Sequence, residues 1–326
     1  MREDLKLMEE EISLHFNGID LLNTGFAKAV IGQKDVFRKL LICLLTDGHM
    51  LLEGVPGIAK TLMAHTFARL ISVDMKRIQF TPDLIPGDII GTVIFNPQTQ
   101  EFYHREGPVF TNILLADEIN RAPAKVQSAL LEAMQERQVT IGEKTYKLQE
   151  PFFVIATQNP IEQEGTYPLP EAQLDRFMFK TIVPYPAFEE EKEILSMYGT
   201  VNSVPVESVT DYIKFKALKD VAGKIFIDPK LKDYLLGIVS ASRDPESKDT
   251  ADLIRLGASP RASLYLLRAA KANAFLEKRA FVIPEDIQKV SFDILRHRLI
   301  ISFNAVSEGI TSDDIIKMIL KKVRVP

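Results

Sequence analysis

Apolar and polar positions alternate in two different periods along the first half of the chain. Short apolar runs predict five strands, at residues 49–53, 77–80, 112–116, 152–157 and 178–182. Between the strands, residues 33–46 and 124–136 repeat apolar side chains every third or fourth position, which predicts amphipathic helices. Strands that alternate with helices predict an α/β fold, a three-layer αβα core around a five-stranded, mainly parallel sheet.

Two segments and one shift of pattern complete this plan. Residues 93–103, with Asn96-Pro97 as turn signal, and residues 138–148, around Gly142, predict β-hairpins outside the main sheet. After Pro184 the strand pattern fades and the chain becomes helical. We therefore predict a core domain over residues 1–184 and a smaller all-α domain over residues 185–326.

Composition narrows the classes of protein that the chain can belong to. Hydrophobic residues make up 46% and charged residues 26%, which is typical of a folded globular protein. The net charge of −4 offers no bulk attraction for nucleic acid. No apolar run approaches the roughly 20 residues of a membrane span, and residues 1–20 lack the pattern of a secretory signal. With a single cysteine, Cys43, we expect a cytoplasmic protein without a membrane span.

A glycine-rich segment follows the first strand and opens a helical stretch: Gly54-Val55-Pro56-Gly57-Ile58-Ala59-Lys60-Thr61. This context is typical of a phosphate-binding loop, because glycines let backbone N–H groups surround phosphate oxygens. Lys60 would reach the β- and γ-phosphates, and Thr61 would coordinate Mg²⁺. The strict pattern has glycine where this chain has Ala59, so we expect that position to avoid positive φ. A simple glycine turn is the alternative.

The third predicted strand ends in two acids, Asp117 and Glu118, which would be costly there without a function. Asp117 suits the surroundings of Mg²⁺, and Glu118 would polarise the attacking water. Capping of a following helix is the alternative explanation for both acids.

The fourth predicted strand runs into Gln158-Asn159-Pro160. Nucleotide sites in open α/β sheets form at the carboxyl ends of strands, where Asn159 would orient water or contact the γ-phosphate. An ordinary Asn-Pro turn is the alternative.

The order of these motifs, with Val30-Ile31-Gly32-Gln33 ahead of the first, resembles that of the AAA+ ATPases. More specifically, the chain resembles the MoxR family in four segments, residues 117–122, 171–177, 259–261 and 284–299. The resemblance spans residue 30 to the end of the chain.

The resemblance implies a role for each matching residue, with ATP and Mg²⁺ as cofactors. Lys60, Thr61 and Asp117 would belong to the Walker motifs, and the nucleotide-binding set would comprise Val30, Ile31, Gly32, Gln33, the segment from Gly54 to Thr61, and Leu62. Asn159 would be sensor 1, Arg261 sensor 2 and Arg176 an arginine finger for a neighbouring subunit. The hairpins would be the helix-2 insert, at about 91–108, and the pre-sensor-1 hairpin at 138–148; both face the pore in related rings.

The charges and helix dipole near Arg261 and Arg176 limit what each arginine can bind. Arg261 lies in the first turn of a predicted helix, where a cation opposes the helix dipole, so a γ-phosphate or an ordinary carboxylate should offset that cost. Arg176 follows Asp175 and either forms a local ion pair or acts in trans. An arginine finger in trans predicts a homo-oligomeric ring, which we expect to be a hexamer.

The expected function is Mg²⁺-dependent ATP hydrolysis. The resemblance implies that hydrolysis remodels or matures a protein client, with metal or cofactor insertion as one form, beside a separate adaptor with a von Willebrand factor A domain. A nucleic-acid motor or loader is the alternative, although the hairpins carry few bases, namely His104, Arg105, Lys144 and Lys147. A non-catalytic nucleotide-dependent scaffold is the third hypothesis, which the joint presence of Lys60, Asp117, Glu118 and Arg176 disfavours.

Overall fold

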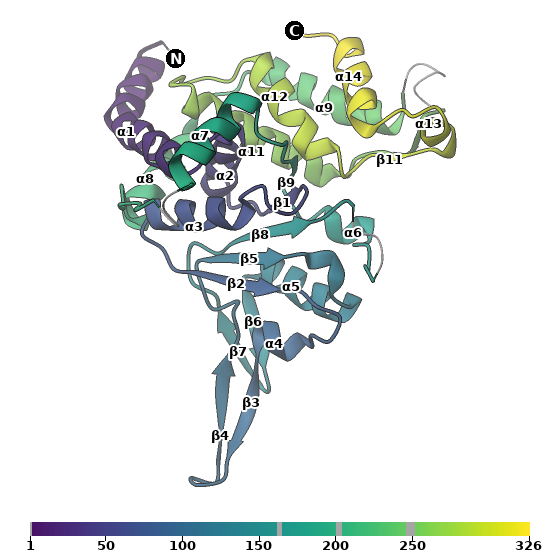
Figure 1. Cartoon of the computed structure of the whole chain (residues 1–326). Helices are drawn as coiled ribbons and strands as arrows, with labels where there is room; N and C mark the ends of the chain where they lie inside the picture. The colour runs from purple at the N-terminus through teal and green to yellow at the C-terminus, as the bar shows by residue number, and fades with distance from the viewer. Residues whose placement is uncertain (1, 162–164, 200–203, 246–251) are drawn as a thin grey trace. The chain divides into compact units, whose positions relative to one another are not determined.

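The computed structural model describes residues 2–161, 165–199, 204–245 and 252–326, which form two compact units (Figure 1). The sheet unit comprises Leu21–Phe177 and Thr181–Phe215, and the helical unit comprises Met1–Asp20, Met178–Lys180 and Lys216–Pro326. This division differs from the predicted boundary after residue 184, because residues 185–215 belong to the sheet unit and the start of the chain to the helical unit. The loss of strand pattern at Pro184 marks a change of secondary structure within one unit.

The sheet has five strands in the order β2-β5-β8-β1-β9. Their bounds are β1 Met50–Glu53, β2 Met75–Gln79, β5 Ile113–Asp117, β8 Phe153–Gln158 and β9 Phe179–Ile182. The pairs β2–β5, β5–β8 and β1–β8 are parallel, as predicted. In this register Asp117 is paired with Gln79 and Glu53 with Gln158, so the carboxyl ends of four strands lie along one edge.

Both faces of the sheet are covered by helices, because the inner strands β1, β5 and β8 are apolar on both sides. On one face Leu114 and Val154 belong to a buried cluster that includes Leu130 of α5. On the other face the ring of Phe153 packs against that of Phe67 of α3, 6.1 Å away. The helices of this part are α1 Arg2–Ala29, which begins in the helical unit, α2 Lys34–Leu45, α3 Lys60–Leu70, α4 Pro86–Ile90, the 3-10 helix η1 Ile119–Arg121, α5 Ala124–Glu136, α6 Glu171–Leu174 and α7 Phe188–Tyr198.

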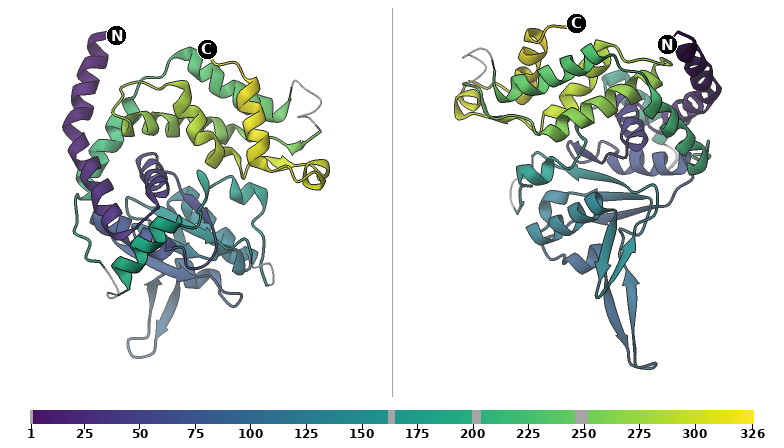
Figure 2. Two further views of the ribbon diagram at one scale, coloured as in Figure 1. Left: turned by 45° about the horizontal axis from the view of Figure 1, so that its top comes forward. Right: turned by 180° about the vertical axis from the view of Figure 1, so that it is seen from behind.

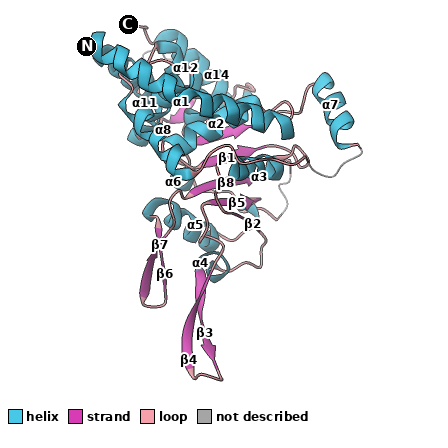
Figure 3. Ribbon diagram, turned by 90° about the vertical axis from the view of Figure 1, so that its left-hand side faces the viewer, coloured by secondary structure: helices cyan, strands magenta, loops and turns pink. Residues whose placement is uncertain are grey.

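Two hairpins project from the sheet unit beyond its helices and main sheet (Figures 2 and 3). They consist of β3 Gly91–Asn96 with β4 Glu101–Glu106, and β6 Gln138–Ile141 with β7 Lys144–Lys147. Near the bases of the two hairpins the ring of His104 packs against that of Tyr146, with ring centroids 5.6 Å apart. Toward the tip of the longer hairpin, Phe95 and Phe102 form a cross-strand pair with ring centroids 5.1 Å apart. Hairpins thus form where the turn signals predict them.

The helical unit contains mainly helices, together with a short antiparallel pair that the sequence pattern does not indicate. Its elements are α8 Tyr212–Lys224, which begins in the sheet unit, α9 Pro229–Arg243, β10 Ile254–Leu256, α11 Pro260–Leu276, α12 Pro284–Leu295, β11 Ile300–Ile301, α13 Phe303–Ser307 and α14 Ser312–Lys322. Asp286 at the start of α12 is buried, and Arg279 satisfies both of its carboxylate oxygens at 2.6 and 2.8 Å. Among the described residues, no helix has the length and apolar character that a membrane crossing requires.

Candidate functional site

The glycine-rich segment forms a tight loop between β1 and α3. Gly57 has φ +85°, and a Cβ there would meet nothing within 4 Å, so its conformation and not its packing calls for glycine. Ala59 has φ 60° and ψ 24°, a left-handed conformation directly before Lys60, so the expectation that it avoids positive φ is wrong. Such a conformation costs a non-glycine residue about 1–2 kcal/mol, which the rest of the loop must offset.

Lys60 begins α3, and its side chain folds back over the loop. Its Nζ donates a hydrogen bond to the carbonyl oxygen of Gly54 at 2.6 Å. Partial burial lowers the pKa of Lys60, while the negative charges of Asp117 and Glu118 oppose that shift. The ammonium of Lys60 therefore lies within electrostatic reach of Asp117 and Glu118, because all three residues lie at the same edge of the sheet. Thr61 is exposed in the first turn of α3, where the backbone N–H groups have no acceptor within the helix.

Asp117 and Glu118 occupy the end of β5, and neither side chain caps a following helix. Glu118 has φ 56° and ψ 51°, an uncommon conformation for glutamate and one that turns the chain sharply after Asp117. The carboxylate of Glu118 accepts from Nε2 of Gln79 at 2.8 Å and forms an ion pair with Nε of Arg121 at 2.7 Å. Neighbouring side chains therefore hold this carboxylate in a defined position.

Thr157 is a site residue that the sequence argument does not single out. It is fully buried in β8, and its hydroxyl donates to Oδ1 of Asp117 at 2.5 Å. The same hydroxyl accepts from the backbone N–H of Glu118 at 2.9 Å. In the sequence, the signal that could have identified Thr157 is a single polar residue at the end of an apolar strand. Thr157 thus fixes both acids through a single hydroxyl.

Arg77 and Gln79 on β2 are two further site residues that the sequence pattern does not indicate. Nε and Nη2 of Arg77 donate to Oδ2 of Asp117 at 3.1 and 2.7 Å, and Nη2 also donates to Oε1 of Gln79 at 2.7 Å. The two residues are separated by one position, so they share a face of the strand. Hydrogen bonds therefore connect Asp117 to Glu118 through Arg77 and Gln79.

Val30, Ile31 and Gln33 are buried beside the loop and line a pocket of about 350 Å³ with it. The other lining residues come from the end of α1, the glycine-rich loop, the first turn of α3, the segment before α7, and α7 itself: Ala29, Gly57, Ile58, Ala59, Leu62, Pro186, Ile194 and Tyr198. Gly32 has φ +76°, and a Cβ there would lie 2.5 Å from the carboxylate of Glu190. Three of the residues that the resemblance assigns to nucleotide binding, Val30, Ile31 and Gln33, therefore line a largely apolar pocket next to the phosphate loop.

Tyr198 contributes to this pocket from a part of the chain that we predicted to be in the all-α domain. Its hydroxyl donates to the carbonyl oxygen of Ala29 at 2.5 Å, and burial raises the pKa of the Tyr198 hydroxyl. This bond attaches α7 to the end of α1 and closes one side of the pocket.

Asn159 is buried immediately after β8, at the same edge of the sheet as Asp117. Its Oδ1 accepts from the backbone N–H of Ile161 at 3.1 Å, as in a local turn. The side-chain oxygen of Asn159 therefore bonds as it would in an ordinary Asn-Pro turn. The amide nitrogen of Asn159 supplies the N–H donors that a sensor residue would need.

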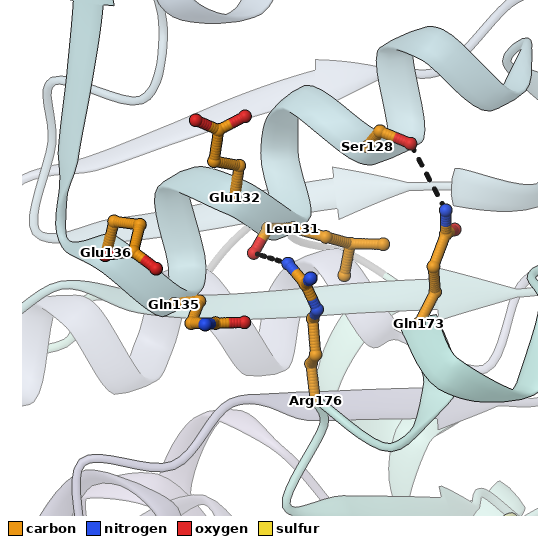
Figure 4. A pocket seen from close by; sticks show the side chains of 7 residues that line it. All are labelled: Ser128, Leu131, Glu132, Gln135, Glu136, Gln173 and Arg176. Carbon is orange, nitrogen blue, oxygen red and sulfur yellow. Dashed lines mark hydrogen bonds between the residues drawn. The ribbon is translucent and has the colours of Figure 1, made fainter.

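Arg176 follows α6 and faces a different hollow of about 400 Å³ (Figure 4). Its Nη1 donates to the carbonyl oxygen of Leu131 at 2.8 Å, and Glu132 and Glu136 of α5 also line the hollow. None of the residues that line it belongs to the phosphate loop or to the tip of β5. Such a placement suits a residue that acts on a partner's nucleotide.

Arg261 lies in the helical unit, at the second position of α11 after Ser259 and Pro260. The first turn of α11 carries no acid. The cation of Arg261 therefore opposes the dipole of α11, as predicted. The role of Arg261 at a nucleotide stays a prediction.

The donor set of the sheet unit fits a magnesium nucleotide. A carboxylate and an exposed threonine hydroxyl are the hard oxygen ligands that Mg²⁺ prefers. A half-buried ammonium and the free first turn of a helix are groups that bind phosphate. Among the described residues there is no cluster of three or more His, Cys, Asp and Glu residues that could hold a metal ion by itself.

Comparisons with known proteins agree with this geometry. A model of the "ATPase family associated with various cellular activities (AAA)" matches residues 49–179, and one of the "AAA lid domain" matches residues 246–319. The chain is 48% identical to Chaperone MoxR1 of Mycobacterium tuberculosis, over 92% of this chain and 80% of that protein. It is 32% identical to protein MoxR of Paracoccus denitrificans, over 84% and 86%. The chain belongs to the MoxR family of AAA+ ATPases.

The crystal structure of a protein from Cytophaga hutchinsonii that is assigned as an ATPase has the same fold as this MoxR-family chain. The TM-score is 0.91 at 47% identity, and the match covers 99% of both chains. The MoxR-family chain is therefore an ATPase, built from a five-stranded αβα core and a helical lid.

Proposed function

We propose that this MoxR-family chain hydrolyses ATP with Mg²⁺ as a homo-oligomeric ring, expected to be a hexamer, and thereby remodels or matures a protein client. One observation carries the catalytic part: Lys60, Asp117 and Glu118 interact electrostatically at one edge of the sheet, between the phosphate loop and the end of β5. When bound there, Mg²⁺ would neutralise charge on the β- and γ-phosphates.

The residues divide the remaining work. Lys60, the loop N–H groups and the first turn of α3 bind phosphate, while Thr61 and Asp117 would hold the cation. Glu118 orients a water molecule and accepts its proton, and Asn159 donates to that water or to the γ-phosphate. The pocket at Val30 and Tyr198 takes the base. Arg176, and Arg261 from the lid, would supply further positive charge to the transition state.

Replacement of Glu118 by Gln tests the catalytic assignment. The amide keeps the shape and can still contact Gln79, but it cannot accept a proton. ATP affinity should stay within about twofold, and multiple-turnover phosphate release should fall about 10²–10⁴-fold. Glu143→Gln, an exposed glutamate in the turn between β6 and β7, is the matched control and should keep full turnover. Undiminished turnover of Glu118→Gln would remove Glu118 from the mechanism.

The longer hairpin supports a protein client. Phe102 is 72% exposed, Phe95 47% and Tyr103 48%, although aromatic side chains are normally buried. Between Asp88 and His104 the only charged residue is Glu101, so the tip offers no cation to a phosphate backbone. An apolar polypeptide segment fits this surface better than a nucleic acid does.

The ring, the adaptor and the compartment belong to the same proposal. The separation of Arg176 from the phosphate loop supports a ring in which each nucleotide site is completed by a neighbour. The chaperone name of the relative MoxR1 supports a client, of which metal or cofactor insertion is one form, and a separate chain would supply any von Willebrand factor A adaptor. The single, buried cysteine suits work in the reducing cytoplasm.

A further inference from the structure

Arg77 lies on β2, an edge strand of the sheet, and reaches the acid that would hold the cation. The guanidinium donates twice to a single oxygen, Oδ2 of Asp117, and once to Gln79. Arg77 is aligned with Leu115, two positions before Asp117, so its side chain extends along the sheet toward the carboxyl edge. The contact therefore depends on the register of β2 against β5.

The two oxygens of Asp117 have different partners. Oδ1 accepts from the buried hydroxyl of Thr157, and Oδ2 accepts from Arg77. The side chain of Asp117 is only 14% exposed, whereas that of Arg77 is 48% exposed. A nearly buried carboxylate is thus neutralised by a cation that water can reach and that can move.

We propose that Arg77 is a positioning residue that neutralises Asp117 in the metal-free protein and competes with the divalent cation for Oδ2. The proposal rests on the proposed function of Asp117 as a residue that holds Mg²⁺. Cation binding requires Arg77 to give up Oδ2, at least in part. Arg77 also donates to Gln79, and Gln79 donates to Glu118, the proposed general base. A movement of Arg77 away from Asp117 would therefore also affect the position of Glu118.

This arrangement has two consequences of opposite sign. Without metal, Arg77 masks the negative charge of Asp117 from the phosphates, so its loss should weaken nucleotide binding. With metal, Arg77 opposes cation binding, so its loss should lower the cation concentration that the protein–nucleotide complex needs. A residue that only maintained the fold would weaken binding under both conditions.

The test uses Arg77→Met, which keeps much of the aliphatic stem and removes the charge. Binding of a fluorescent ATP analogue is measured by anisotropy in excess chelator, and Mn²⁺ binding to the protein–ADP complex is measured by electron paramagnetic resonance. In chelator we expect affinity for the analogue to fall about threefold to tenfold, and the half-saturating Mn²⁺ concentration to fall by a similar factor, as the loss of a half-exposed ion pair allows. Arg77→Lys should give intermediate values.

Lys76→Gln is the matched control, because it removes a charge from the adjacent, exposed position of β2. It should change neither quantity. In an Asp117→Asn background the Arg77→Met substitution should no longer shift Mn²⁺ binding, since its target charge is gone.

An unchanged Mn²⁺ dependence in Arg77→Met, or weaker binding both with and without metal, would overturn the proposal. If Arg77→Met does not fold, Arg77→Lys decides, because an unaltered half-saturating Mn²⁺ concentration would then count against competition. If the wild-type protein binds no nucleotide at all, the proposed function fails instead. The two failures are therefore distinguishable.

Discussion

The hydroxyl of Thr157 donates a hydrogen bond to Oδ1 of Asp117, 2.5 Å away, between two adjacent strands. The hydroxyl oxygen of Thr157 also accepts a hydrogen bond from the backbone N–H of Glu118, a residue with a left-handed backbone conformation. A single buried side chain therefore orients one acid directly and the other through its backbone. The positions of both acids depend on β5 and β8 keeping their register.

Replacement of Thr157 by Val keeps the shape of the side chain and removes both hydrogen bonds. We expect the free energy of unfolding to fall by about 1–3 kcal/mol, because the N–H of Glu118 and Oδ1 of Asp117 lose the hydroxyl that bonds them. We also expect phosphate release to fall by about 10–100-fold, since the two acids would no longer be held. Thr157→Ser restores the hydroxyl and should recover most of both. Turnover in the Val variant equal to that of the wild type would contradict this role.

Ala59 gives a prediction about the phosphate loop itself. Glycine adopts φ 60° without the clash that alanine suffers, but it costs more chain entropy. We expect Ala59→Gly to raise the free energy of unfolding by up to about 1 kcal/mol and to keep ATP affinity. Ala64→Gly, within helix α3 that follows Ala59, should instead lower the free energy of unfolding by about 1 kcal/mol. Chemical denaturation of both variants measures the contrast, and destabilisation by Ala59→Gly would show that the loop does not strain alanine.

The main sheet can be predicted from the sequence because its inner strands β1, β5 and β8 are buried on both faces. The run at residues 113–116 is uniformly apolar, and turn or acidic residues mark its ends, so the strand bounds agree within one or two residues. Parallel strands bring Lys60 and Asp117 to one edge whatever the order of the strands. The fold therefore follows from local pattern.

The rest of the site depends on pairings between distant parts of the chain. Arg77 and Thr157 are each 40 residues away from Asp117, and only the strand order β2-β5-β8 makes them its neighbours. Tyr198 lines the pocket beside the phosphate loop because α7 belongs to the sheet unit, although its helical pattern looks like that of the lid. A backbone conformation such as that of Ala59 is set by the closure of the loop, and residue type alone predicted the opposite.

His49 gives a pH dependence of stability. The ring is fully buried, its Nδ1 accepts from the N–H of Val154, and its Nε2 lies 3.1 Å from the carbonyl oxygen of Met134. Burial, helped by the positive charge of Arg137, lowers the pKa of His49 from 6.5 to about 4. The neutral ring is therefore part of the folded structure.

The unfolded chain binds a proton at His49 below about pH 6.5, and the folded chain does so only near pH 4. The contribution of His49 is therefore complete above pH 6.5 and is lost as the pH falls toward 4, by up to about 3 kcal/mol. Urea unfolding between pH 7.5 and 4.5 measures this loss, and His49→Gln should flatten the curve. His65→Gln, at an exposed position of α3, serves as the control. Equal slopes for the two variants would exclude His49 as the cause.

The exposed aromatic pair of the longer hairpin predicts a separation of client binding from ATP hydrolysis. Phe102 contacts Phe95 across the strands of a hairpin that projects away from the main sheet (Figure 3). We expect Phe102→Ser to leave basal ATPase activity and stability nearly unchanged, the latter within about 0.5 kcal/mol because the ring is mostly exposed. Binding of a fluorescently labelled, apolar unfolded polypeptide should weaken by about fivefold or more, since the hairpin would lose its largest exposed ring.

Thr99→Ser, in the turn of the same hairpin, is the matched control and should bind the polypeptide as the wild type does. Competition with single-stranded DNA separates the two client classes, because a phosphate-binding tip would release the polypeptide in a salt-dependent way. If Phe102→Ser binds the polypeptide with unchanged affinity, the client surface lies elsewhere on the chain. The ATPase assignment would stand in that case, because it depends on Lys60, Asp117 and Glu118 and not on the hairpin.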